Sequence, residues 1–98
     1  MPDQPAYGPL NEQVVDQITR AVHAGFENQT RFLADFVAIP SLRFEEGPAQ
    51  DFMAAALRAR GYAVDDWTIK TADLEHLHGY GEIHGDFSRA RSVVGTHH

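Results

Sequence analysis

Five residues that can bind a metal ion or transfer protons lie close together in the C-terminal third of the sequence. Three histidines and two carboxylates fall within eleven positions: His76, His78, Glu82, His84 and Asp86. Imidazole nitrogens and carboxylate oxygens are ligands that Zn²⁺ accepts. The His-x-His spacing in a glycine-rich stretch nevertheless differs from the regular spacing of known zinc motifs. A solvated loop is the simpler interpretation, and a small metal-binding protein is one hypothesis.

Other chemically capable residues have structural explanations that need no catalysis. Glu45 and Glu46 could form an acid/base pair, but carboxylates beside a helix N-terminus are favoured on electrostatic grounds alone. Ser41 lacks the Gly-x-Ser-x-Gly turn that exposes a nucleophilic serine. Arg43, in the same loop, could contact a substrate in a longer relative. We assign no catalytic, metal-binding or cofactor-binding residue to this chain.

The remaining candidates are placed by the elements around them. His23 lies in a predicted helix, Asp65 and Asp66 in a predicted strand where they face water, and Trp67 is expected to pack with Tyr62 against the helices. His97 and His98, at the end of the sequence, are native residues or the remnant of a tag.

Composition excludes several function classes. The net charge of −6 and the scattered distribution of eight Lys and Arg residues argue against a nucleic-acid partner. The absence of cysteine excludes disulfides, thiolate metal sites and thiol nucleophiles. No apolar run approaches the length of a membrane span and no secretory signal is evident, so the expected partners include no membrane and the expected location is cytoplasmic.

The stretch from Phe32 to Tyr62 organises the predicted fold. Apolar residues at helical spacing end at Pro40, which cannot continue a helix. A second helix of about 13 residues is predicted to begin at Gly47-Pro48, because proline is tolerated at the first helical position. Gly61 occupies the position where a left-handed cap ends such a helix.

On either side of this stretch the pattern is simpler. Residues 1–10 are predicted to be a flexible lead-in, and Asn11 is predicted to cap one helix of about 28 residues with weak points at Gly25 and at 28–30. Strands are predicted near 62–69, with a phase slip at 65–66, and near 92–97. Between them we expect a short helical turn capped by Asp73 and an extended piece over 83–87. The expected fold class is α/β: long helix, second helix, then two or three strands.

A set of ordered segments resembles the start of the zinc-dependent amidohydrolases, the family of acetylornithine deacetylase, succinyl-diaminopimelate desuccinylase and aminoacylase. The resemblance covers about Thr30 to His97, with Ser92 standing where the family usually has asparagine. The segments that carry it are Phe36-Val37-Ala38-Ile39-Pro40-Ser41, the helix ending in Leu57 and Gly61-Tyr62, Asp86-Phe87-Ser88, and Val93-Val94-Gly95-Thr96.

The resemblance implies that residues 11–98 are the incomplete N-terminal part of one catalytic α/β domain. In the family, the first zinc ligands lie on a His-x-Asp motif after the next strand, so no residue here matches a ligand or the general base. A longer relative would use one or two zinc ions to polarise an amide and activate water, on a small amide or N-acyl amino acid substrate. This segment would bind no metal and would be inactive alone.

An alternative from another class is a stand-alone interaction module. Val93 and Val94 leave the edge of the last predicted strand without the charge or proline that blunts such edges. The module would pair through this edge with a partner strand or with a second copy of itself.

Overall fold

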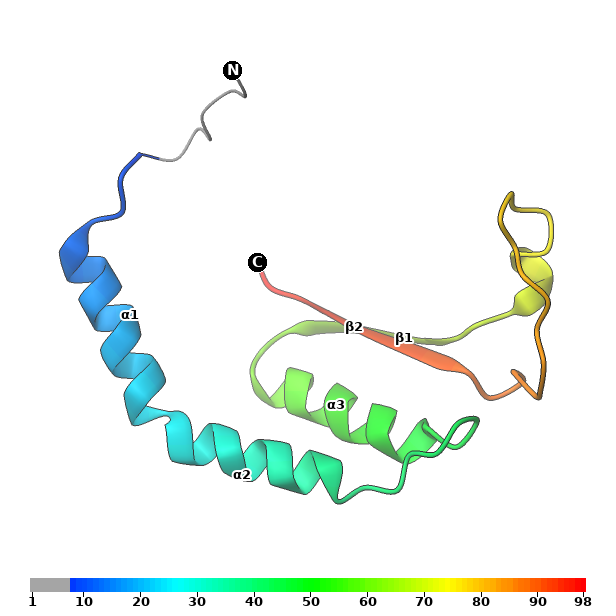
Figure 1. Cartoon of the computed structure of the whole chain (residues 1–98), viewed down its shortest axis with the longest axis horizontal. Helices are drawn as coiled ribbons and strands as arrows, with labels where there is room; N and C mark the ends of the chain where they lie inside the picture. The colour runs from blue at the N-terminus through cyan, green and yellow to red at the C-terminus, as the bar shows by residue number, and fades with distance from the viewer. Residues whose placement is uncertain (1–7) are drawn as a thin grey trace. The chain divides into compact units, whose positions relative to one another are not determined.

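The computed structural model describes residues 8–98 and divides the chain into two compact units (Figure 1). The first unit ends at Ala34 and the second runs from Asp35 to His98. Most of the predicted lead-in lies outside the described residues; its last three, 8–10, are irregular and exposed. None of the helices in 8–98 is long and apolar enough to cross a bilayer.

The predicted long helix is divided in two. Helix α1 spans Glu12–Ala24 and helix α2 spans Phe26–Val37. Asn11 caps α1 as expected, because its side chain accepts a hydrogen bond from the Gln13 amide at 2.8 Å. The interruption falls at Gly25, although the Gly25 amide still donates to the Ala21 carbonyl. Of the two predicted weak points only Gly25 breaks the helix, since residues 28–30 lie within α2.

The second predicted helix begins and ends where its sequence signals place it. Helix α3 spans Gly47–Ala59 and carries Pro48 in its first turn. Gly61 has a φ of 82°, the left-handed conformation expected after a helix. The Phe36 and Phe52 rings stack at 5.7 Å, so the last turn of α2 packs on α3 within the second unit.

The two strands form an antiparallel sheet. Strand β1 (Ala63–Thr68) pairs with strand β2 (Arg91–Thr96) in a continuous register from Ala63 opposite Thr96 to Thr68 opposite Arg91. The predicted phase slip at 65–66 is therefore wrong. The connection over residues 69–90 contains one 3₁₀ turn, η1 (Thr71–Asp73), which Asp73 ends rather than caps. Residues 83–87 form no strand.

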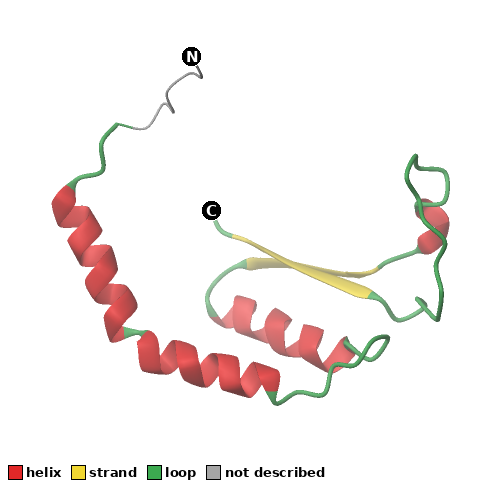
Figure 2. Ribbon diagram, in the orientation of Figure 1, coloured by secondary structure: helices red, strands yellow, loops and turns green. Residues whose placement is uncertain are grey.

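The core of the second unit lies between α3 and one face of the sheet (Figure 2). A Cβ added to Gly95 would lie 3.0 Å from the end of the Leu57 side chain, so β2 packs tightly on α3 at this position. On the opposite face, Trp67 and Val94 are 43% and 47% exposed. The expectation that Trp67 packs against the helices is wrong, because strand alternation turns its side chain away from α3.

The described core is small. Among residues 8–98 only Ala49 and Ala54, both on α3, are buried apolar residues. Large apolar side chains on α1 remain exposed, for example Ile18 at 59% and Val22 at 57%. The mixed α/β class predicted from the sequence is confirmed at this general level.

Candidate functional site

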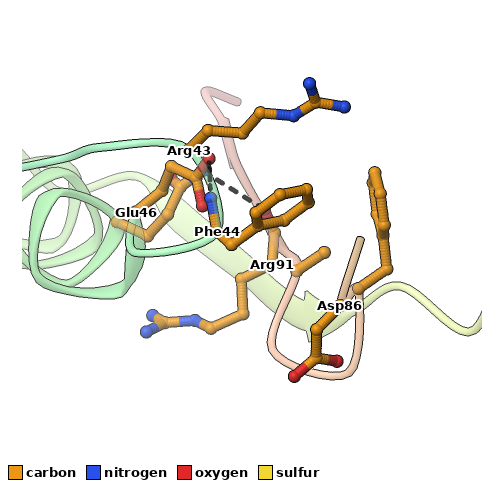
Figure 3. Close-up of a pocket in the computed structure, with 8 residues that line it drawn as sticks. Arg43, Phe44, Glu46, Asp86 and Arg91 are labelled. Carbon is orange, nitrogen blue, oxygen red and sulfur yellow. Dashed lines mark hydrogen bonds between the residues drawn. The ribbon is translucent and has the colours of Figure 1, made fainter. Parts of the chain in front are cut away.

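A pocket of about 290 Å³ lies between two irregular segments of the second unit (Figure 3). One segment joins α2 to α3 and contributes Arg43 and Phe44. The other leads into β2 and contributes Asp86 and Phe87, and Arg91 at the start of β2 also lines the pocket.

Phe44 is the conformational outlier of this pocket. It is the one residue other than glycine with a positive φ, 73°, in the described chain, and its amide donates to the Glu46 carboxylate at 2.9 Å. Gly85, with φ 116°, lies so close that an added Cβ would be 2.1 Å from the Phe44 ring. The Phe87 ring meets Phe44 edge-on at 5.5 Å. Strained conformations of this kind cost free energy and persist only where the surroundings enforce them.

Arg43 is the exposed cation of the pocket. Its guanidinium lies 4.9 Å from the centre of the Phe44 ring. In Figure 3 it extends on the opposite side of that ring from the Asp86 carboxylate. Within residues 8–98 it forms no hydrogen bond or ion pair with another side chain.

The Asp86 carboxylate is engaged by its own loop. Hydrogen bonds from the Ser88 side chain and backbone amide, the latter at 2.9 Å, lower the pKa of Asp86. The carboxylate is therefore held in its charged form, which suits a fixed acceptor rather than a general base at neutral pH.

Arg91 fastens the sheet to α3. Its guanidinium donates to Asp66 on β1 at 2.8 and 3.0 Å and to Asp51 on α3 at 2.7 Å. Hydrogen bonds to Asp66 and Asp51 raise the pKa of Arg91, and the same contact lowers the pKa of Asp66. Sequence inspection missed this cluster, although an arginine opening an apolar strand was the available signal.

The metal-binding hypothesis gains no support from the geometry. In the part of the chain that the structure describes, no three His, Asp or Glu side chains are placed to share a metal ion. Of the predicted cluster, only His84 and Glu82 approach one another, at 3.8 Å with both side chains well exposed. The expected solvated loop is what the structure places there.

The other sequence candidates are dispersed. Glu46 precedes α3 but bonds the Phe44 amide instead of capping the helix, while Glu45 and Ser41 are exposed in the same loop. His97 packs edge-on against Tyr62 at 5.6 Å. Of the sequence candidates, Arg43, Glu46 and Asp86 line the pocket, and Arg43 is the one of these three whose side chain has no hydrogen bond or ion pair within residues 8–98.

Comparisons with protein-family models, with curated proteins and with solved structures find no match for this chain. Two aromatic rings and one unpaired guanidinium can bind a ligand, but no nucleophile with an adjacent base is present there. The arrangement is suited to binding.

Proposed function

We propose that this chain is the N-terminal segment of a zinc-dependent amide hydrolase of the deacetylase, deacylase or exopeptidase type. In this proposal, residues outside these 98 provide the zinc ligands and the general base. The segment supplies helices α1, α2 and α3 and the first strands of the catalytic domain. Its substrate, in the full-length enzyme, is a small amide or an N-acyl amino acid.

The observation that carries the proposal is the ordered set of segments from Phe36 to Thr96. The structure supports it by bringing two of them together: the loop after Ile39-Pro40-Ser41 and the loop containing Asp86-Phe87-Ser88 meet through the Phe44 and Phe87 rings. The last segment, Val93-Val94-Gly95-Thr96, lies in β2. Residues distant in the sequence thus line one pocket.

The described residues do not themselves fit zinc, because no cluster of three suitable ligands is present in 8–98. No catalytic step is therefore assigned to this chain. Its proposed contribution is to position the strand beside which the catalytic residues of the longer enzyme would lie.

Sequencing the DNA downstream of the His98 codon tests the proposal directly. We expect an open frame that continues into an apolar strand ending in His-x-Asp. A stop codon with no such motif in any nearby frame would exclude catalysis by this route. Metal-dependent deacylase activity in the purified 98-residue chain would also overturn the proposal, since this segment is expected to be inactive.

The outer edge of β2 favours a second candidate function, an interaction module that pairs through this strand. The Ile69 amide donates to the Ala90 carbonyl at 2.7 Å. Because hydrogen-bonded and non-hydrogen-bonded residue pairs alternate along an antiparallel sheet, the backbone amides of Arg91, Val93 and Gly95 point away from β1. Gln50 donates to the Arg91 carbonyl at 3.2 Å and so covers one end of this edge. The Val93 and Gly95 groups remain available for a second copy or a partner strand.

Sedimentation equilibrium over a wide concentration range tests the module. If a second copy pairs through β2, Val94→Lys should reduce association, because it places a charge on the exposed edge strand. Val22→Lys is the matched control, since Val22 is similarly exposed on α1 in the other unit. Equal association of both variants and the unmodified chain would rule out self-pairing through this edge.

A further inference from the structure

We propose that the pocket between the two loops binds a small carboxylate that carries an aryl or bulky apolar group. The carboxylate is bound by the Arg43 guanidinium, and the apolar group packs against the Phe44 and Phe87 rings. The proposed function assigned the chain no ligand-binding residue of its own, so this inference adds a site to it.

The charged side chains that line the pocket, two arginines and two carboxylates, differ in whether they have a partner. Arg91 is neutralised by Asp51 and Asp66, at 2.7 and 2.8 Å. Glu46 accepts the Phe44 amide and Asp86 accepts the Ser88 amide, so each acidic group already has a donor. Arg43 is the cation of this pocket without a carboxylate partner in the described chain, and guanidinium binds carboxylates through two parallel hydrogen bonds.

The aromatic rings select the rest of the ligand. Phe44 and Phe87 are in edge-to-face contact at an interplanar angle of 75°, and both line the pocket, so they supply its apolar surface. The volume of about 290 Å³ lies near the lower limit of ligand pockets, so the ligand is small. The positive φ of Phe44 and the missing Cβ of Gly85 place the ring at this position.

Within the proposed hydrolase, this ligand class corresponds to an N-acyl amino acid with a large apolar side chain. The identification of the ligand as an N-acyl amino acid rests on the proposed function. The proposal that the pocket binds a small aryl carboxylate does not. The probe is N-acetyl-L-phenylalanine, titrated into the 98-residue chain while backbone amide shifts are followed by ¹H–¹⁵N NMR. We expect shifts at the amides of Phe44, Phe87 and Arg91.

Two comparisons isolate the carboxylate contact. N-acetyl-L-phenylalanine amide, which lacks the anion, should bind about tenfold more weakly or worse, and Arg43→Gln should weaken binding of the acid by a similar factor. Arg43→Lys should retain part of the affinity because it keeps the charge but loses the bidentate geometry. Arg20→Gln, on α1, is the matched control and should leave binding unchanged.

Equal affinity for acid and amide, or unchanged binding by Arg43→Gln, would overturn the assignment of Arg43. Absence of saturable shifts around Phe44 and Phe87 would overturn the pocket itself. These failures are distinct from failure of the hydrolase proposal: binding together with a stop codon after His98 retains the pocket and removes the hydrolase. An open frame that encodes His-x-Asp, together with no binding of the probe, would retain the hydrolase proposal and remove the pocket proposal.

Discussion

Phe44, Gly85 and Arg91 show how single residues hold this small unit together. Phe44 keeps a left-handed backbone because its amide bonds Glu46 and its ring is packed between Gly85 and Phe87. Arg91 joins a strand to a helix through two carboxylates. With so few buried apolar residues described, such contacts carry an unusual share of the specificity of the fold.

Replacing Gly85 by alanine should destabilise the second unit more than replacing Gly61. Both glycines have positive φ, so each alanine variant incurs about 1 kcal/mol of backbone strain. Only at Gly85 does the new methyl group also collide with the Phe44 ring, which adds about 1–3 kcal/mol. Urea unfolding followed by circular dichroism measures both. Equal losses would show that Phe44 is not packed against Gly85.

The Asp66–Arg91 contact should make stability depend on acidic pH. The pKa of Asp66 in the folded chain lies below its ordinary value of 3.8, so its contribution is complete above that value and is lost as the pH falls through the lowered one. Asp66→Asn should unfold at lower urea concentration at neutral pH, and the difference from the unmodified chain should shrink in acid. The pKa of Asp86 is also lowered, but Asp86 is present in both proteins. Its effect on the pH dependence of stability therefore cancels, and the difference in stability between the two proteins reports Asp66 alone. A difference that stays constant with pH would contradict this assignment.

At the level of secondary structure, the helices follow local signals and their boundaries were largely predictable. Asn11, Pro48 and Gly61 each act through their own backbone or cap: α1 begins directly after Asn11, and α3 carries Pro48 in its first turn and ends two residues before Gly61. Helix α2 ends at Val37, three residues before Pro40. Glycine at position 25 lowers helix propensity, which explains why the long predicted helix divides there.

Gly25→Ala should therefore join α1 and α2 more firmly. Gly25 already has a φ of −86°, which alanine can adopt, and its new Cβ would lie 3.3 Å from the Ala21 carbonyl oxygen, a contact that a small adjustment relieves. We expect a gain of up to about 1 kcal/mol in helix stability, seen as a stronger circular dichroism signal at 222 nm. A weaker helical signal would show that the interruption is required.

Contacts between distant segments could not be predicted in the same way. The alternation of residues 62–69 indicated a strand, but nothing local indicated that it would pair antiparallel with β2 across residues 69–90. The pocket depends on that pairing, because it sets Phe87 beside Phe44. Arg43 was noted for its type and place in a loop, whereas the roles of Gly85 and Arg91 follow only from tertiary contacts.

At the scale of the molecule, the second unit exposes the sheet face opposite α3. Trp67 and Val94 lie on that face and are each more than two-fifths exposed. Asp65 lies opposite Val94 and Ser92 opposite Trp67, so apolar and polar side chains share this face. In the proposed longer enzyme, additional residues would cover it.

Trp67 reports on this face, because it is the single tryptophan of the sequence. In the dilute 98-residue chain, we expect emission typical of solvated indole and efficient quenching by acrylamide. A blue shift that grows with concentration would indicate a second copy on this face, and a blue shift in a longer product would indicate cover by its additional residues. Protected, blue-shifted emission at all dilutions of the 98-residue chain would contradict the exposed position of Trp67.

The connection over residues 69–90 also bears on the order in which the second unit folds. Closing a loop of that length costs on the order of 2 kcal/mol more than closing a two-residue hairpin, and the cost is incurred before the strands pair. Helix α3 and β1 are separated only by residues 60–62, so they can meet first. Strand β2 would then join the unit last, and the contacts of Arg91 would form late in folding. A change in the length of this connection would therefore alter the folding rate more than it alters the stability of the folded unit.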